Sequence, residues 1–129
     1  MIAAMPLVDL DVDFASSLPG LAPRTSFRLE RIAGAEGLHA LRSTGDDLRL
    51  FVLDPARCGL AYEPSFTAET LAAIEASADE LLLFVVANPA DDGVCVNLRA
   101  PILVNARTGA GTQVIFDEGT YPIRARLGA

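Results

Sequence analysis

The sequence predicts an all-β fold, mainly antiparallel, in the form of a single-domain β-barrel-like roll with one short helix. Apolar and polar residues alternate with the period of two that is typical of strands, the connections are short and rich in turn-forming residues, and only one segment carries helix signals. Strands do not alternate with helices as they would in an α/β protein, so a barrel or rolled sheet is favoured. The 129 residues, 51% of them hydrophobic, suit one domain over residues 1–129.

Four strands are predicted in the N-terminal half. Leu7–Phe14 alternates apolar residues with aspartates, and the three aspartates on one face would discourage edge-to-edge pairing. Ser26–Ile32 can form the second strand. Leu38–Arg42 and Leu48–Leu53 follow, separated by a turn-rich spacer of hairpin length. Leu48–Leu53 carries apolar residues on both faces near its end, so we expect it to be a central strand.

One segment has the signals of a helix. Thr67 can act as its N-cap, and Glu69 lies in the first turn, where the helix dipole favours negative charge. Phe66 and Leu71 stand at the spacing of a hydrophobic staple, which would fix the angle at which the chain enters the helix. The helix should end near Ser77.

Next along the chain, Glu80–Ala87 reads as a strand buried on both faces, because six of its residues in succession are large and apolar. Asn88 and Pro89 should end this strand, since proline cannot donate to a ladder.

Val94–Ala106 is predicted to be one long strand, because seven successive even-numbered positions are apolar. A turn over residues 107–111 and a strand over Thr112–Asp117 would complete an antiparallel hairpin. We expect the even-numbered face to meet the core and the odd-numbered face to meet water or a partner. Pro101 lacks an N–H group, so the strand should bend, bulge or lie on an edge there.

Charge and composition argue against several functions. The formal net charge is −7, and all ten basic residues are scattered arginines, whereas nucleic-acid and anionic-membrane surfaces need clustered positive charge. The longest apolar run, Leu81–Ala87, is far shorter than the roughly 20 residues that span a bilayer. We therefore expect a cytoplasmic protein that contacts neither nucleic acid nor membrane directly and is a monomer when free. Its acidity would suit a basic partner.

Reactive residues show no arrangement typical of catalysis. Cys58 and Cys95 lack the spacing of a metal site or disulfide framework, and His39 has no fixed partner for a triad. We predict no catalytic, cofactor-binding or metal-binding residues and no enzymatic activity, with a small barrel enzyme or ligand carrier as the alternative. The adjacent acidic pairs are interpreted as solvated turn residues: Asp46-Asp47, Asp91-Asp92 and Asp117-Glu118.

The odd-numbered face of the long strand is the best candidate for binding. It mixes apolar and hydrogen-bonding side chains, as protein-docking faces do. Equally, Leu103 could be covered by a loop or helix of this chain. The candidate surface comprises this face and the C-terminal segment Tyr121–Arg126. Its candidate partner contacts, or supports for such contacts, are Asn97, Arg99, Pro101, Leu103, Asn105 and Tyr121.

These same residues carry a resemblance to the flagellar assembly factor FliW family. The run Asn97–Asn105 and the ending Tyr121–Arg124 are the most specific parts, and the resemblance covers nearly the whole chain. Other segments agree in order: Leu18–Leu21, Leu50–Pro55, Tyr62–Pro64, the apolar run ending at Asn88-Pro89, and the positions Thr108, Gly111, Gln113 and Val114.

The resemblance implies a cytoplasmic, non-enzymatic, barrel-like protein that binds flagellin and also binds CsrA, a small RNA-binding translational repressor. In that scheme, export of flagellin frees the FliW-like protein, which then sequesters CsrA and allows flagellin translation to resume. The alternative is a FliW-like barrel that serves an unrelated protein partner. No cofactor is implied.

Overall fold

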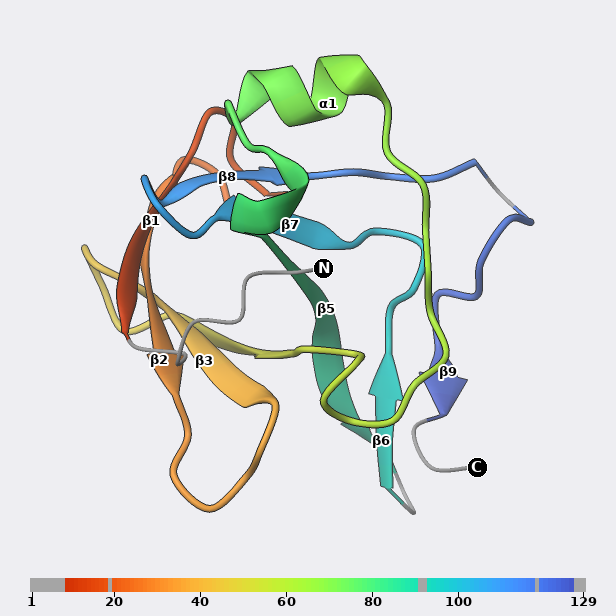
Figure 1. Ribbon diagram of the computed structural model, residues 1–129. Helices are drawn as coiled ribbons and strands as arrows, with labels where there is room; N and C mark the ends of the chain where they lie inside the picture. The colour runs from red at the N-terminus through yellow and green to blue at the C-terminus, as the bar shows by residue number, and fades with distance from the viewer. Residues whose placement is uncertain (1–8, 19, 91–92, 118, 127–129) are drawn as a thin grey trace.

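A computed structural model describes residues 9–18, 20–90, 93–117 and 119–126. Within these ranges the chain forms strands with only two short helical segments, which confirms the predicted all-β class with one short α-helix (Figure 1). The elements are β1 (Leu10–Phe14), β2 (Ser26–Arg31), β3 (Leu38–Ser43), β4 (Arg49–Leu53), α1 (Ala68–Ala73), the 3₁₀ helix η1 (Ala78–Glu80), β5 (Leu81–Ala90), β6 (Gly93–Val96), β7 (Ile102–Asn105), β8 (Ala110–Gln113) and β9 (Ala125–Arg126). Of the predicted elements, Leu7 and Val8 of the first strand and the acidic residues 91, 92 and 118 lie outside the described residues.

The sheet closes into a barrel. Its strand order is β4-β3-β2-β1-β8-β7-β5-β6-β9, and an additional pairing of β4 with β5 joins the ends of the ring. Neighbouring strands run antiparallel except β1 and β8, which pair in parallel through Asp13 opposite Ala110. Because β1 has neighbours on both sides, its aspartates do not protect an edge. Instead, Asp11 forms an ion pair with Arg28 of β2, at 2.8 Å.

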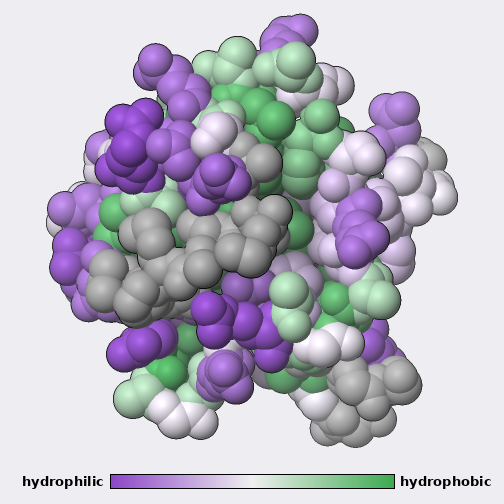
Figure 2. Space-filling model, viewed as in Figure 1, coloured by the Kyte–Doolittle hydropathy of each residue, from purple (hydrophilic) through white to green (hydrophobic). Residues whose placement is uncertain are grey.

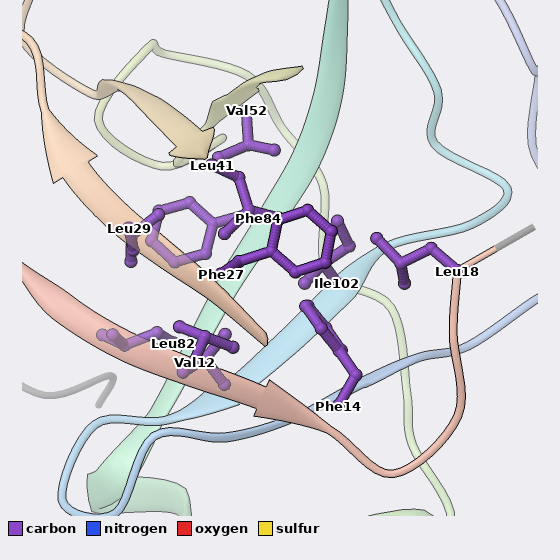
Figure 3. Close-up of a cluster of buried hydrophobic side chains, with 11 residues drawn as sticks. Val12, Phe14, Leu18, Phe27, Leu29, Leu41, Val52, Leu82, Phe84 and Ile102 are labelled. Carbon is purple, nitrogen blue, oxygen red and sulfur yellow. The ribbon is translucent and has the colours of Figure 1, made fainter. Parts of the chain in front are cut away.

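One hydrophobic core fills the barrel. It gathers side chains that point inward from β1, β2, β3, β4, β5 and β7, with Leu18 closing one end (Figure 3). Phe14 and Phe27 meet edge to face with ring centroids 5.7 Å apart. Each fully buried side chain of this size stabilises the fold by roughly 1.5–3 kcal/mol, so the inward positions of the period-two pattern determine the closed shape.

A second hydrophobic core lies outside the barrel, against β5 and β7. The long connection between β4 and β5, which includes α1, covers these strands and contributes Tyr62 and Ile74. In Figure 1 this connection runs over the top of the molecule, with α1 above β7 and β8. As a result β7 is buried on both faces, with Val104 in the first core and Leu103 in the second.

The helix begins as predicted. Thr67 is the N-cap of α1, and its hydroxyl oxygen accepts a hydrogen bond from the N–H group of Thr70 at 3.1 Å. The helix is shorter than predicted: it ends at Ala73, before the expected end near Ser77. Glu75, which follows it, has a left-handed backbone conformation with φ of 53°.

Strand β5 extends further than the sequence suggested. Asn88 and Pro89 were expected to end it, but both pair with β6, opposite Cys95 and Val94. Pro89 is tolerated because it occupies a non-hydrogen-bonded position, so its nitrogen points away from β6.

The prediction of one long strand over Val94–Ala106 is wrong. The structure has two strands, β6 and β7, which both pair with β5 and are separated by a bend over residues 97–101. The bend also changes which face is buried: Val96 belongs to the second core, whereas Val104 belongs to the first. The chain does bend at Pro101, as the missing N–H group predicted.

The antiparallel pairing of β7 with β8 confirms a hairpin here, but β8 covers Ala110–Gln113 in place of the predicted Thr112–Asp117. Gly109 lies at the end of the turn between them with φ of 83°, and a Cβ atom at this position would stand 2.1 Å from the backbone oxygen of Asp11. Glycine is therefore required for two reasons, its left-handed conformation and the close approach of β1.

Candidate functional site

The candidate site is built on the bend over residues 97–101. The side-chain oxygen of Asn97 accepts a hydrogen bond from the N–H group of Arg99 at 3.0 Å, which closes a local turn. The Leu98 carbonyl accepts from the Tyr62 hydroxyl at 2.6 Å, and the Leu98 N–H group donates to Pro122 at 3.1 Å. Side-chain and backbone contacts thus replace the interrupted ladder and hold the bend in one conformation.

The C-terminal segment lies against this bend. The N–H groups of Val114 and Phe116 donate to the carbonyls of Pro101 and Arg99, at 3.0 and 2.8 Å. The Arg99 side chain in turn donates through Nε to the carbonyl of Tyr121 at 3.0 Å. The first two bonds continue the register of the β7–β8 hairpin past the ends of both strands, and the bond to Tyr121 adds the following stretch, so that together they form one continuous wall.

An aromatic cluster supports the wall from behind. Tyr62 and Tyr121 meet edge to face with centroids 5.2 Å apart, and Phe116 contacts both Tyr121 and Phe66. Burial raises the pKa of the Tyr62 hydroxyl, with the neighbouring Tyr121 as a smaller cause. The Tyr62 hydroxyl is therefore un-ionised at neutral pH and can keep donating to the bend.

An open groove of about 610 Å³ runs along the outside of this wall. Its floor and sides are mostly apolar, and Ile115 and Ile123 are the large hydrophobic residues most exposed in the described chain, at 63% and 51%. We call this feature the groove. It is lined by Leu18, Leu21, Leu50, Val86, Asn88, Asn97, Arg99, Ala100, Gln113, Ile115, Ile123 and Arg124.

The groove differs in charge from the protein as a whole. Among the described residues, its lining includes Arg99 and Arg124 but no carboxylate, although the protein carries a net charge of −7. Figure 2 shows one face of the molecule, on which hydrophilic residues predominate and hydrophobic residues form smaller patches between them. An apolar groove with a cationic rim is a surface that can bind an apolar, acidic partner segment.

The structure divides the six predicted contact residues into two groups. Asn97 and Arg99 line the groove, and Tyr121 is half-buried beside it and holds Arg99 through its carbonyl. Pro101, Leu103 and Asn105 are buried, with Leu103 and Asn105 fully covered. Leu103 packs in the second core with Ile74. Of the two alternatives for Leu103, the structure therefore shows the one in which this chain's own β4–β5 connection covers it.

Ten of the twelve groove residues were not among the six contacts predicted from the sequence, although Ile123 and Arg124 belong to the C-terminal segment Tyr121–Arg126 that was proposed as part of the surface. Ile115 follows β8, and Leu18 comes from the connection after β1. The one signal for Ile115 is the run Val114-Ile115-Phe116, in which three consecutive apolar residues cannot all face the same core. The groove itself forms only when distant segments meet, and no local pattern predicts that.

Of the reactive residues considered in the sequence, His39 and Cys58 both lie near Asp54, which acts electrostatically on each, whereas Cys95 belongs to β6. Cys58 and Cys95 are free thiols, and burial raises the pKa of Cys58. His39 is buried in β3, and desolvation lowers its pKa. Across the described ranges, no group of three or more His, Cys, Asp or Glu side chains is placed to hold a metal ion. No helix within the same ranges is both long and apolar enough to cross a bilayer.

Fold and groove together define a class of protein: a small closed β-barrel with an apolar, cation-rimmed groove open on its outside. The family model described as "FliW protein" matches residues 7–127. Among characterised proteins, the flagellar assembly factor FliW of Thermotoga maritima is 31% identical over 119 residues, which cover 88% of this chain and 80% of the relative. The flagellar assembly factor FliW of Symbiobacterium thermophilum is 32% identical over 120 residues, 89% of this chain and 87% of the relative.

A solved structure agrees with these sequence matches. The crystal structure of the flagellar assembly factor FliW superposes with a TM-score of 0.81 at 26% identity, covering 91% of this chain and 84% of that one. The chain belongs to the FliW family. The resemblance drawn from the sequence is therefore confirmed, and so is the barrel that it implied.

Proposed function

We propose that this protein is a non-enzymatic, protein-binding regulator of flagellar assembly. In this proposal it binds flagellin and sequesters the translational regulator CsrA, which relieves the repression of flagellin translation. Membership of a family whose relatives are named flagellar assembly factors supports the proposal. The groove is the observation that carries the binding role, because it exposes Ile115 and Ile123 beside arginines.

The exposed isoleucines favour a macromolecular partner. Isolated apolar side chains on a surface need no explanation, but two that line one groove with Leu18 and Leu21 form a contiguous patch. Burying such a patch against a partner yields roughly 25 cal/mol for each Å² removed from water. Asn97 lines the same groove, and its polar side chain would fix the orientation of the bound partner and add specificity.

The six residues predicted from the sequence have two roles in this proposal. Asn97, Arg99 and Tyr121 contact the partner or orient the residues that do. Pro101, Leu103 and Asn105 support the bend and β7 from inside, because their side chains are buried.

The acidity of the protein fits one of the proposed partners. An RNA-binding repressor carries positive charge for RNA, and a protein with a net charge of −7 would attract it at long range. We place the complex in the cytoplasm, because both proposed partners are encountered there before export of flagellin. In this proposal the free protein is a monomer.

Isothermal titration calorimetry tests the proposal directly. Purified protein is titrated with flagellin and with CsrA, and binding to each with a dissociation constant at or below tens of micromolar is expected. Displacement of CsrA from a flagellin leader RNA, followed by gel shift, measures sequestration. The absence of binding to both proteins would contradict the function and would leave a FliW-like barrel that serves an unrelated partner.

Matched variants locate the binding surface. Ile115→Asp and Ile123→Asp place a carboxylate in the groove and should weaken binding by about tenfold or more, because the charge must be desolvated against an apolar partner. Ala33→Asp makes the same kind of change on the exposed loop between β2 and β3, outside the groove. Equal affinities for all three variants and the unchanged protein would show that the partners bind elsewhere.

A further inference from the structure

Among the described residues, the chain that leaves β8 has hydrogen-bond partners on one side only. The N–H groups of Val114 and Phe116 donate to the bend, to the carbonyls of Pro101 and Arg99. Successive N–H groups of an extended chain point in opposite directions, so the N–H and carbonyl of Ile115 point away from the bend. No described residue forms a hydrogen bond with the backbone of Ile115.

Gln113 continues this unpaired side. It lies opposite Ile102 in β7, at a position between hydrogen-bonded pairs, so its own N–H and carbonyl also point away from β7. On that side β1 pairs only with Ala110 and Gly111 and does not reach Gln113. Residues 113–115, called here the open edge, therefore present successive backbone donors and acceptors without a neighbouring strand in the described part of the chain.

The open edge forms part of the groove wall. Gln113 and Ile115 line the groove together with Leu18 and Leu21. The Nε2 of Gln113 donates to the carbonyl of Ala100 at 3.0 Å, while its buried Oε1 accepts no hydrogen bond within the described structure. A polar edge beside an apolar floor is the arrangement that a β-strand needs when it binds in a groove.

The charged residues of the groove indicate which side chains a bound strand should carry. Within the described ranges, ion pairs with carboxylates are formed by Arg24, Arg28, Arg42, Arg57 and Arg107. Arg99 and Arg124 line the groove and form no ion pair among the described residues. A bound segment with carboxylate side chains would meet both guanidinium groups without competition from an acidic residue of the groove.

We propose that a partner binds by adding an extended segment, in which apolar and acidic residues alternate, as a strand along the open edge. The segment's backbone pairs with Gln113 and Ile115, its apolar side chains enter the groove, and its carboxylates face Arg99 and Arg124. This inference rests on the proposed function in one respect, that the groove is the binding surface. It adds the mode of binding and the chemistry of the bound segment.

A titration followed by ¹⁵N NMR tests the mode with a defined probe. The probe is a synthetic peptide of roughly eight residues, the usual order of strand length, with alternating valine and glutamate and capped ends. At concentrations up to about 1 mM, corresponding to weak binding, the amide signals of Gln113 and Ile115 should shift and become protected from hydrogen exchange. A valine–lysine peptide should bind about tenfold more weakly.

Two variants at one position separate backbone from side chain. Ile115→Pro removes an N–H group that has no hydrogen-bond partner among the described residues, so it should leave the fold intact and weaken peptide binding by about tenfold. Ile115→Val keeps the N–H group and should change affinity by less than about twofold. If Ile115→Pro fails to fold, a peptide N-methylated at alternate residues gives the same test on the ligand, and its binding should be lost.

The outcomes distinguish this inference from the proposed function. Unchanged amide signals at residues 113–115, or equal binding by the N-methylated peptide, would overturn strand addition. Peptide binding at the edge without binding of flagellin or CsrA would support strand addition and contradict the proposed partners. Sedimentation of the free protein tests whether a second copy of this chain occupies the open edge. A dimer that Ile115→Pro abolishes would show that it does and would overturn the inference.

Discussion

The side-chain amide of Asn105 donates a hydrogen bond to the carbonyl oxygen of Ile74, 31 residues earlier in the chain, at 3.0 Å. It also donates to Glu75 at 3.2 Å, and its oxygen accepts from the N–H groups of Arg107 and Thr108. This buried side chain therefore ties the end of the helical connection to the β7–β8 turn. Its role is to hold the covering of the second core in place.

Asn105→Ala should lower the free energy of unfolding by about 3 kcal/mol, because it leaves buried carbonyl and N–H groups without partners. Asn97→Ala is the matched control, since Asn97 is half-exposed and makes a single local hydrogen bond, for which a loss of about 1 kcal/mol is expected. Urea denaturation of both variants measures the difference. Equal losses would show that the Asn105 network adds nothing beyond one ordinary bond.

Gly109→Ala should destabilise the barrel by about 2–5 kcal/mol, from the left-handed conformation and the clash with Asp11 together. Gly34→Ala separates these causes, because Gly34 has φ of 82° and open space around it. That variant should lose only about 1–2 kcal/mol. Thermal unfolding of both proteins provides the comparison, and a Gly109 variant no weaker than the Gly34 variant would remove the clash as a cause.

Glu75→Gly should stabilise the protein by about 1 kcal/mol. Glu75 is the one non-glycine residue of the described chain with positive φ, and glycine adopts that conformation without steric cost. Ala72→Gly, inside α1, should instead lose about 1 kcal/mol. Chemical denaturation measures the change in the free energy of unfolding for both variants. The two changes have opposite signs if the left-handed backbone of Glu75 is strained, and the same sign if it is not.

The stability of the protein should fall as the pH drops below about 6.5, the ordinary pKa of histidine. Desolvation lowers the pKa of His39 in the folded state; Arg57 and Arg31 add to this, while the Gly37 carbonyl and Asp54 oppose it. The unfolded chain then binds more protons than the folded chain between the folded pKa and 6.5. Stability is thus fully present above pH 6.5 and decreases below it, by at most about 1.4 kcal/mol per pH unit.

Urea denaturation between about pH 7.5 and 5.5 checks this dependence on His39. His39→Leu keeps an apolar contact for Phe84, whose ring centroid lies 5.1 Å from that of His39, and removes the titrating group. The variant should show a flatter pH profile than the unchanged protein. Parallel profiles would assign the pH dependence to other groups.

Tyr62→Phe should cost about 1 kcal/mol, because the bend loses the hydrogen bond from the hydroxyl to the Leu98 carbonyl while the ring packing remains. Tyr121→Phe is the control, since no described residue forms a hydrogen bond with the Tyr121 hydroxyl, and it should change stability by less than about 0.5 kcal/mol. Denaturation midpoints and groove amide shifts measure both. Identical effects would show that the hydroxyl does not hold the bend.

Local patterns predicted most of the barrel. Period-two alternation located β1, turn-forming residues separated β3 from β4, and the capping signals located the start of α1, because these features depend on residues close in sequence. The same alternation failed over Val94–Ala106. The even-numbered positions stay apolar through the bend, but Val96 packs in the second core and Val104 in the first. The sequence pattern does not show this change, because it depends on the β4–β5 connection that covers the second core.

The candidate site was predictable in part for the same reason. Asn97 and Arg99 drew attention as polar residues on an otherwise apolar strand, and they do line the groove. Leu103 looked equally exposed by its phase, yet the β4–β5 connection covers it. Ile115 reaches the bend because the β7–β8 hairpin continues past β8, whereas Ile123 gains its place in the groove from the later return of the chain, which has no local signal.

The parallel pairing of β1 with β8 has a consequence for how the chain acquires its shape. Asp13 and Ala110 lie far apart in the sequence, so the ring cannot close until the chain has been made through β8. During synthesis, the β2–β3–β4 meander can form early, but β1 waits without its second neighbour until β8 has left the ribosome. Truncation before β8 should therefore leave an open, aggregation-prone sheet that lacks the groove wall around Gln113 and Ile115.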